Sequence, residues 1–172
     1  TDHVIVNNYF EGLKGTRWDA PITLTQGDAI DGVDTSLSKH FRAERVTIAY
    51  NTLVDNTYGI EIGFDNNDKY NKGLIDITFA NNLITGATNN LVNYVEGQDQ
   101  GNEITWINNI MFPTGTASLT SDGSTFTNEE VLVTNPNLTF DGTVWRSTAS
   151  SPTLASGVPS LFVTEDIEGQ SR

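Results

Sequence analysis

Residues 3–17 read His-Val-Ile-Val-Asn-Asn-Tyr-Phe-Glu-Gly-Leu-Lys-Gly-Thr-Arg, and variations on the first part of this pattern recur along the chain. Apolar and polar residues alternate up to an asparagine pair, and more apolar residues follow. Alternation predicts a half-buried strand. Asparagine tolerates the left-handed backbone conformation that a tight corner needs. The stretch therefore predicts a strand that turns a corner at asparagine.

Three later segments, residues 45–56, 73–86 and 101–112, repeat this pattern. Their aligned asparagines are 43, 31 and 27 residues apart, within the roughly 20–50 residues typical of solenoid repeats. These aligned residues are Asn8, Asn51, Asn82 and Asn109. Second strands are expected at residues 22–25, 59–64, 91–95 and 117–120. Two or three strands per repeat with no helices predict an all-β fold, a right-handed parallel β-helix (solenoid). A β-sandwich is disfavoured, because the Asp-Gly pairs do not join matched alternating runs.

The organisation expected from this pattern is one β-helix domain over residues 1–172. Regular coils are predicted for residues 1–123 and an irregular C-terminal cap, a terminal wrap, for residues 124–172. A cap is needed because the last coil of a solenoid exposes backbone groups and core side chains. The loop at residues 29–44 is unusually long, so it is either functional or an excursion from the coil. The sequence opens inside a strand pattern, which suggests a fragment of a longer chain.

The composition and charge of the chain limit the classes of molecule that it is expected to bind. The chain has 172 residues, a formal net charge of −13 and a pI near 4.2, so nucleic acid is a poor partner. Seven of its nine Lys and Arg residues lie in residues 1–72, so a polyanion would bind the first half. There is no cysteine, hence no disulfide framework or thiolate metal site. No stretch approaches the ~18 apolar residues of a membrane span, so no membrane partner is expected.

The candidate binding residues lie on two loops. Lys14 and Arg17 follow the first asparagine corner closely, and two cations there can clamp a carboxylate or sulfate. Trp18 follows and could stack on a sugar face. Lys39 and His40 lie on the long loop, where histidine could carry a proton at neutral pH. The plainer alternative for all five residues is an ordinary solvated loop.

Other polar residues carry weaker signals. His3 precedes a strand and is expected to be structural. Glu61 alternates with two isoleucines, so it should point outward, and ordinary surface is favoured over sugar recognition. Glu61 and Asp65 form the only tempting carboxylate pair for an inverting glycosidase, which needs them about 6.5–9.5 Å apart. The oxygen-rich groups Asp28-Asp31-Asp34 and Asp65-Asn67-Asp68 do not match the spacing of a calcium loop, so no metal site is predicted in this chain.

The opening run resembles a motif of polysaccharide lyase family 6, which holds alginate lyases and chondroitinase B. Three further stretches agree with the family in order: residues 48–53 with 58–63, then residues 79–82, then the tail at residues 163–170. The resemblance covers nearly the whole chain. The first motif is fairly specific, whereas asparagine pairs alone would fit any β-helix.

The resemblance implies cleavage of a uronate polysaccharide by β-elimination. In the family, Ca²⁺ held by one Asn and two Glu neutralises the uronate carboxylate, a Lys is the base and an Arg is the acid. Those residues lie on coils that precede the opening motif. The chain therefore looks like the C-terminal part of such a lyase, with its catalytic residues and calcium ligands expected upstream of Thr1. The isolated chain is expected to be inactive.

Within this chain, Arg17 matches a family arginine that binds anionic groups of the substrate, and Lys14, Lys39 and His40 align more loosely. Glu61 departs from the Asp common at its position in alginate lyases. Alginate is preferred over dermatan sulfate, because the opening motif and residues 60–63 look closer to the alginate members. The expected partners are an acidic polysaccharide and the missing N-terminal coils, with a homodimer left open. The expected location is secreted or periplasmic, in a bacterium.

One alternative class stays open from the sequence. The chain could be a β-helix without lyase chemistry, either a carbohydrate-binding module or a glycoside hydrolase. Release of reducing sugar without unsaturated ends would favour the hydrolase.

Overall fold

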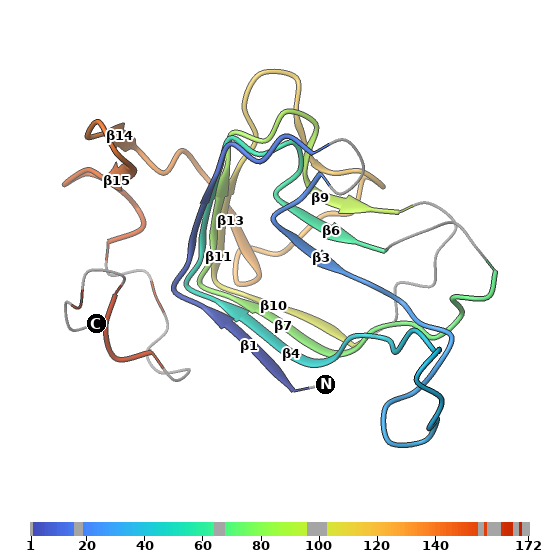
Figure 1. The fold of residues 1–172 in the computed structure, drawn as a ribbon. Helices are drawn as coiled ribbons and strands as arrows, with labels where there is room; N and C mark the ends of the chain where they lie inside the picture. The colour runs from blue at the N-terminus through green and yellow to red at the C-terminus, as the bar shows by residue number, and fades with distance from the viewer. Residues whose placement is uncertain are drawn as a thin grey trace.

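The computed structural model describes residues 2–15, 19–63, 68–95, 103–154, 157, 163–166 and 169. These residues form fifteen strands joined by turns and loops, with no helix among them. Parallel sheets of four, five and four strands stack into a solenoid, and the last two strands form a separate hairpin (Figure 1). The expected all-β, right-handed parallel β-helix is confirmed, with the handedness that parallel crossovers take almost without exception. Among the described residues, no helix has the length and apolarity needed to cross a membrane.

Each coil supplies one strand to each of three sheets. Sheet A joins β1 (His3–Val6), β4 (Glu44–Ala49), β7 (Ile75–Ala80) and β10 (Ile104–Ile107). Sheet B joins β2 (Tyr9–Glu11), β5 (Thr52–Val54), β8 (Leu83–Thr85), β11 (Asn109–Phe112) and β13 (Val131–Val133). Sheet C joins β3 (Ile22–Leu24), β6 (Ile60–Ile62), β9 (Asn90–Tyr94) and β12 (Ser118–Thr120). Sheet C thus contains the second strands that the sequence predicts.

Two consecutive residues form the corner between sheets A and B, and each has a different role. The first residue has a positive φ: Asn7 62°, Tyr50 56°, Asn81 54° and Asn108 51°. This left-handed conformation turns the chain from one sheet to the next, and asparagine tolerates it better than most residues. The second residue is always the aligned asparagine, whose side chain is therefore available for bonding between coils.

The aligned asparagines form a hydrogen-bonded ladder through the solenoid. Nδ2 of each donates to Oδ1 of the next, at 2.9 Å from Asn8 to Asn51, 3.1 Å from Asn51 to Asn82 and 2.9 Å from Asn82 to Asn109. The backbone N–H groups of the first three donate to the same oxygens at 3.0 Å. Asn51, Asn82 and Asn109 are at most 2% exposed. Because buried amides must be hydrogen-bonded, the ladder fixes the register between coils.

Inward side chains of successive coils stack into apolar columns. In sheet A the column contains Ile5, Ile48, Phe79 and Trp106, and the last two rings stack with centroids 4.2 Å apart. Ile48 and Phe79 are fully buried, whereas Ile5 of the first coil is only partly buried. Burial of a large apolar side chain contributes about 1.5–3 kcal/mol, so these columns supply much of the stability.

The chain beyond coil 4 returns along the outside of the solenoid. β13 adds a fifth strand to sheet B, past the predicted end of the regular coils at residue 123. The hairpin of β14 (Leu138–Phe140) and β15 (Trp145–Ser147) then reaches back to coil 1, where the Trp145 backbone N–H donates to Tyr9 Oη at 3.0 Å. Further on, Val163 packs on Ala49, Tyr50 and Ala80. The division into coils up to residue 123 and a cap over residues 124–172 stays a prediction.

Candidate functional site

The two loops with predicted binding residues lie at opposite ends of sheet C. β3 begins after the loop that contains Lys14 and ends before the loop that contains Lys39 and His40 (Figure 1). The structure therefore does not bring Lys14 together with the other two residues. Arg17 and Trp18 lie outside the described residues, so their predicted roles stay predictions.

Lys14 lies on the corner where sheet B leads into sheet C. Its Nζ donates to Thr88 Oγ1 of coil 3 at 2.9 Å, and the side chain is exposed. The loops of successive coils stack here, since Thr57 N–H donates to Leu13 O and Asn89 N–H donates to Thr57 O. Lys14 thus lies along a stacked edge of the solenoid, where its ammonium can reach an anion in solvent.

Lys39 and His40 lie on a connection that is held firmly to the coil. His40 N–H donates to Asp28 Oδ1 at 2.8 Å, and His40 O accepts from the N–H groups of Asp28 and Ala29. Its ring lies 5.3 Å from the ring of Tyr70, which belongs to the connection of the next coil and is 6% exposed. The two ends of the long loop are therefore hydrogen-bonded to each other, and the choice between a functional loop and an excursion from the coil stays a prediction.

Two further lysines join this end of sheet C. Lys69 Nζ lies 4.5 Å from the centroid of the Tyr70 ring, a cation–π contact. Lys72 and Gly27 exchange backbone hydrogen bonds of 2.9 and 3.1 Å, which tie the two connections together. The sequence analysis did not select Lys69 or Lys72. The available signal was their place after the second sheet C strand, equivalent to that of Lys39 after the first.

Polar side chains fill the outward face of sheet C between these two ends. Thr23, Glu61 and Asn93 are in register on neighbouring strands. Glu61 points outward as expected, but the expectation of ordinary surface is wrong, because the residue is only 8% exposed. Asn93 Nδ2 donates to Glu61 Oε2 at 3.0 Å. Alternation predicts the direction of a side chain and cannot reveal what covers it.

The environment of Glu61 favours its protonated form. Burial raises the pKa of this carboxyl above its ordinary value, the Asn93 hydrogen bond lowers it, and the charge of Asp19 raises it. Asp19 Oδ1 is itself buried and has no hydrogen-bond partner among the residues that the structure describes. Glu61 is therefore a largely buried carboxyl group of raised pKa that lies within the electrostatic reach of a second carboxylate, Asp19.

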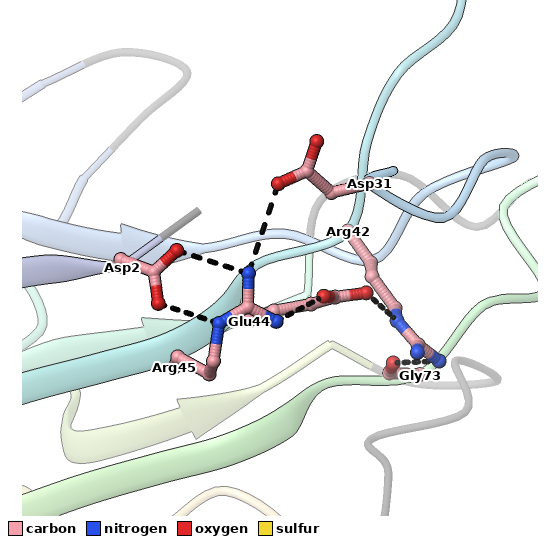
Figure 2. A network of polar contacts seen from close by, with 6 residues as sticks. All are labelled: Asp2, Asp31, Arg42, Glu44, Arg45 and Gly73. Carbon is pink, nitrogen blue, oxygen red and sulfur yellow. Dashed lines mark hydrogen bonds and ion pairs between the residues drawn. The ribbon is translucent and has the colours of Figure 1, made fainter. Parts of the chain in front are cut away.

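Two arginines at the start of β4 are bound to acids: Arg42, which precedes the strand, and Arg45, its second residue. Arg42 Nε donates to Glu44 Oε1 at 2.6 Å and Arg45 Nη1 donates to Glu44 Oε2 at 2.8 Å (Figure 2). Arg42 also reaches Gly73 O of the next coil at 3.5 Å. Glu44 is 4% exposed, and the hydrogen bond from Arg42, followed by that from Arg45, holds its pKa below the ordinary value. A buried carboxylate with two charged donors is a structural feature of this corner.

Arg45 extends the network to coil 1 and to the long loop. Its Nε and Nη2 bind the two carboxylate oxygens of Asp2 at 2.5 and 3.0 Å, and Nη2 lies 3.7 Å from Asp31 Oδ2 (Figure 2). Arg42 and Arg45 are therefore engaged with protein carboxylates.

The acids of the long loop also have structural partners. Asp28 Oδ1 accepts from His40 N–H, Asp34 Oδ2 accepts from Ile30 N–H at 3.0 Å, and Asp31 faces Arg45. Among the residues that the structure describes, no group of three or more His, Cys, Asp or Glu side chains is arranged to hold a metal. Asp65 and Asn67 lie outside the described residues.

A family model described as Chondroitinase B matches residues 1–146 of the chain. The match covers all four coils, β13, β14 and the start of β15, and the resemblance expected for residues 163–170 stays a prediction. No match to the chain was found among curated proteins or among solved structures.

Proposed function

The chain belongs to the chondroitinase B family, and on that basis we propose that it supplies the C-terminal coils and part of the substrate groove of a lyase that cleaves alginate. Membership supports polysaccharide lyase chemistry at the level of the family. The observation that carries the proposal further is sheet C, whose polar outward face is flanked by lysines at both ends. A polyuronate lying across it would meet cations at its carboxylates and hydrogen-bonding groups at its hydroxyls.

The reaction sets three requirements for such a groove. β-Elimination removes the proton at C5 of a uronate and expels the oxygen at C4, so the carboxylate must be neutralised, a base must take the proton and an acid must give one back. In our proposal Lys14, Arg17, Lys39 and His40 bind uronates that flank the cleaved bond, with Trp18 stacked on a sugar. Holding several sugars in place aligns the reacting one with the catalytic groups.

The choice of alginate rests on the opening motif and on residues 60–63, which look closer to the alginate members of the family that the sequence resembles. Charge density does not separate the two polymers, because alginate carries one carboxylate per sugar and dermatan sulfate one carboxylate and one sulfate per pair of sugars. Arg42 and Arg45 are engaged with Glu44, Asp2 and Asp31, so in this proposal lysines bind the carboxylates.

We further propose that the base, the acid and the ligands of the Ca²⁺ ion lie on coils upstream of residue 1. Asp28, Asp31 and Asp34 do not fit the ion, because they are turned to partners within the long loop and β4. In the complete enzyme Ca²⁺ would supply charge neutralisation of the substrate carboxylate. The residues of this chain would bind and orient the neighbouring sugars. We place the enzyme outside the cytoplasm, secreted or periplasmic, where such a polymer is met.

An ultraviolet assay tests this function. The enzyme that includes the upstream coils should release products with a 4,5-unsaturated end, which absorb in the ultraviolet, faster from alginate than from dermatan sulfate. The 172-residue chain alone should bind alginate and release none. Absence of unsaturated product from every uronate polymer would contradict lyase chemistry, and a preference for dermatan sulfate would contradict the substrate.

The burial of Glu61 favours a second candidate, a β-helical glycoside hydrolase. A carboxyl of raised pKa is suited to act as a general acid, which a hydrolase needs together with a second carboxylate. Asp65, the partner considered from the sequence, lies outside the described residues. Reducing ends that form without ultraviolet absorbance, and that disappear in Glu61→Gln, would support this alternative.

A further inference from the structure

Glu61 lies in the middle of the outward face of sheet C. It is the central residue of β6, and its register partners are Thr23 on β3 and Asn93 on β9. Its neighbours in the strand, Ile60 and Ile62, are 0% exposed in the core, so the carboxyl group points away from the interior. A ligand that lies over these three strands therefore passes over the Glu61 carboxyl group.

The two oxygens of this carboxyl group have different surroundings. Oε2 accepts a hydrogen bond from Asn93 Nδ2 at 3.0 Å. Oε1 accepts none from the described residues, and it is not one of their fully buried unpartnered oxygens. A proton on Oε1 would leave the Asn93 hydrogen bond in place. Glu61 can therefore accept from the protein with one oxygen and donate to a ligand with the other.

The groups that face this carboxyl from the described residues include no cation. Thr23 and Asn93 carry no charge, and Tyr94, the next residue of β9, stays neutral because burial raises its pKa to about 12. Asp19, on the loop before β3, is the described charged group that acts on Glu61, and it is an acid. The described lysines near sheet C lie on loops beyond its strands: Lys14, Lys39, Lys69 and Lys72. A uronate over the middle of the sheet therefore meets acids, whereas uronates over its ends meet lysines.

Asp19 makes a further negative charge at this place unfavourable. Its Oδ1 is buried and has no hydrogen-bond partner among the described residues. Its backbone oxygen accepts from Tyr58 N–H at 3.2 Å, so the Asp19 loop is attached to the coil that contains Glu61. Carboxyl groups that share a site do not all ionise readily, and the pKa of one of them rises. A uronate carboxylate added beside Asp19 therefore disfavours the ionised form of Glu61.

We propose that Glu61 binds polyuronate in its protonated form and donates a hydrogen bond from Oε1 to a carboxylate oxygen of one uronate. One proton from solvent is taken up with each oligosaccharide that binds, so binding weakens as the pH rises. An O–H group that donates to a carboxylate makes a strong hydrogen bond, with the two oxygens about 2.5–2.7 Å apart. The inference rests on the proposed function for the identity of the ligand, and it adds that this face binds the ligand in a pH-dependent way.

An NMR titration of the Glu61 carboxyl carbon in the 172-residue chain tests this directly, with ¹³C-labelled glutamate and Glu61→Gln to assign the signal. Without ligand, Glu61 should titrate above its ordinary value of 4.5. With a saturating alginate oligosaccharide, it should titrate at a pH higher by about one unit or more, because a second carboxylate then faces it. An unchanged titration in the presence of bound oligosaccharide would overturn the proposal.

Calorimetric binding measurements between pH 5 and pH 8 at constant salt give a second readout. Wild-type affinity should fall by up to about tenfold per pH unit above the pKa of free Glu61, with uptake of about one proton per bound chain. Glu61→Gln keeps an oxygen for Asn93 and places a permanent N–H donor at the position of Oε1. It should bind at pH 8 as the wild type does at pH 5, without proton uptake. Wild-type affinity that is independent of pH, or loss of binding by Glu61→Gln at every pH, would overturn the proposal.

His40 provides the matched control, because histidine is the side chain that ordinarily changes charge in this range. Its hydrogen bonds to Asp28 and Ala29 are made by its backbone, so His40→Gln keeps them. The pH dependence should persist in His40→Gln and move to lower pH in Asp19→Asn. Its disappearance in His40→Gln would assign the proton to His40 and overturn the proposal. Absence of binding at every pH would contradict the proposed function as well, whereas a negative lyase assay would count against lyase chemistry alone.

Discussion

Asn82 shows how one side chain holds neighbouring coils together. It is 2% exposed, its Oδ1 accepts two hydrogen bonds from Asn51, and its Nδ2 donates to Asn109 Oδ1 and to Ile48 O. Without this side chain, the buried N–H of Asn51 and the Ile48 carbonyl oxygen lose the hydrogen bonds that they make with it, while Asn109 Oδ1 keeps the Asn82 backbone donor. An unsatisfied buried group costs about 1–3 kcal/mol.

Asn82→Ala should therefore lower the free energy of unfolding by about 2–4 kcal/mol, measured by urea denaturation. Asn8→Ala is the matched control, because Asn8 is exposed at the end of the ladder and Asn51 Oδ1 would keep the Asn8 backbone donor. We expect it to lose less than about 1 kcal/mol. Equal losses would show that the ladder does not carry the register.

Glu44 predicts a loss of stability in acid. Its pKa is lowered in the folded state, chiefly by the hydrogen bond from Arg42. A lowered folded-state pKa contributes stability above the ordinary value of 4.5, and that contribution disappears as the pH falls through the folded-state pKa. Glu44→Gln should be less stable than the wild type at pH 7, and the difference should shrink towards pH 3. Thermal melts across this range measure it, and a constant difference would contradict the assignment.

Glu61 should have the opposite effect on how stability depends on pH. Its pKa is raised in the folded state by burial, so ionisation destabilises the fold once the pH rises above the ordinary value of 4.5. Glu61→Gln keeps an oxygen for Asn93 and removes the buried charge. It should melt higher than the wild type at pH 7 and lose that advantage below pH 4. A lower melting temperature at pH 7 would mean that the carboxylate is stabilised by a contact other than Asn93.

The sequence predicted which way these side chains point better than it predicted which groups surround them. Alternation was enough to place Glu61 on the outward face and to align the four asparagines. The sequence pattern did not show which residue of each corner takes the positive φ. Tyr50 adopts the left-handed conformation that an asparagine adopts in the other coils. Burial on an outward face depends on what lies over it, and no local pattern encodes that.

At the scale of elements, the β14–β15 hairpin is held to coil 1 through Tyr9. The Tyr9 hydroxyl accepts from Trp145 N–H at 3.0 Å and donates to Glu11 Oε2 at 2.7 Å, and burial raises its pKa to about 12. This contact joins residues 136 positions apart. Strand positions repeat locally and were predictable, whereas such a return contact leaves no periodic signal in one sequence.

Tyr9→Phe should free the hairpin without disturbing the coils. Loss of one hydrogen bond of about 1 kcal/mol should speed amide exchange at Trp145 by about fivefold, while exchange in β7 stays unchanged. Tyr58→Phe is the control, because the described residues place no hydrogen bond on the Tyr58 hydroxyl. Unchanged exchange at Trp145 would show that apolar contacts such as Phe140 with Trp145 hold the hairpin instead.

At the scale of the whole molecule, stacked coils turn a short repeat into an extended face. Sheet C brings together residues from three coils, Thr23, Glu61 and Asn93, and separates Lys14 from Lys39 and His40. The sequence could predict the solenoid and the loops that carry cations. It could not predict which loops share an end of a sheet, because that depends on the direction in which each strand crosses the coil.

The account is tested most directly by mapping where an alginate oligosaccharide binds, using backbone NMR shifts of the 172-residue chain. We predict shifts that follow sheet C, at residues 12–15 at one end, around Glu61 and Asn93 in the middle, and at residues 39–43 and 68–74 at the other end. They should weaken with added salt, since lysine contacts with carboxylates are screened. Shifts confined to sheet A or the β14–β15 hairpin, or no binding at low salt, would contradict the assignment of sheet C as the polysaccharide-binding face.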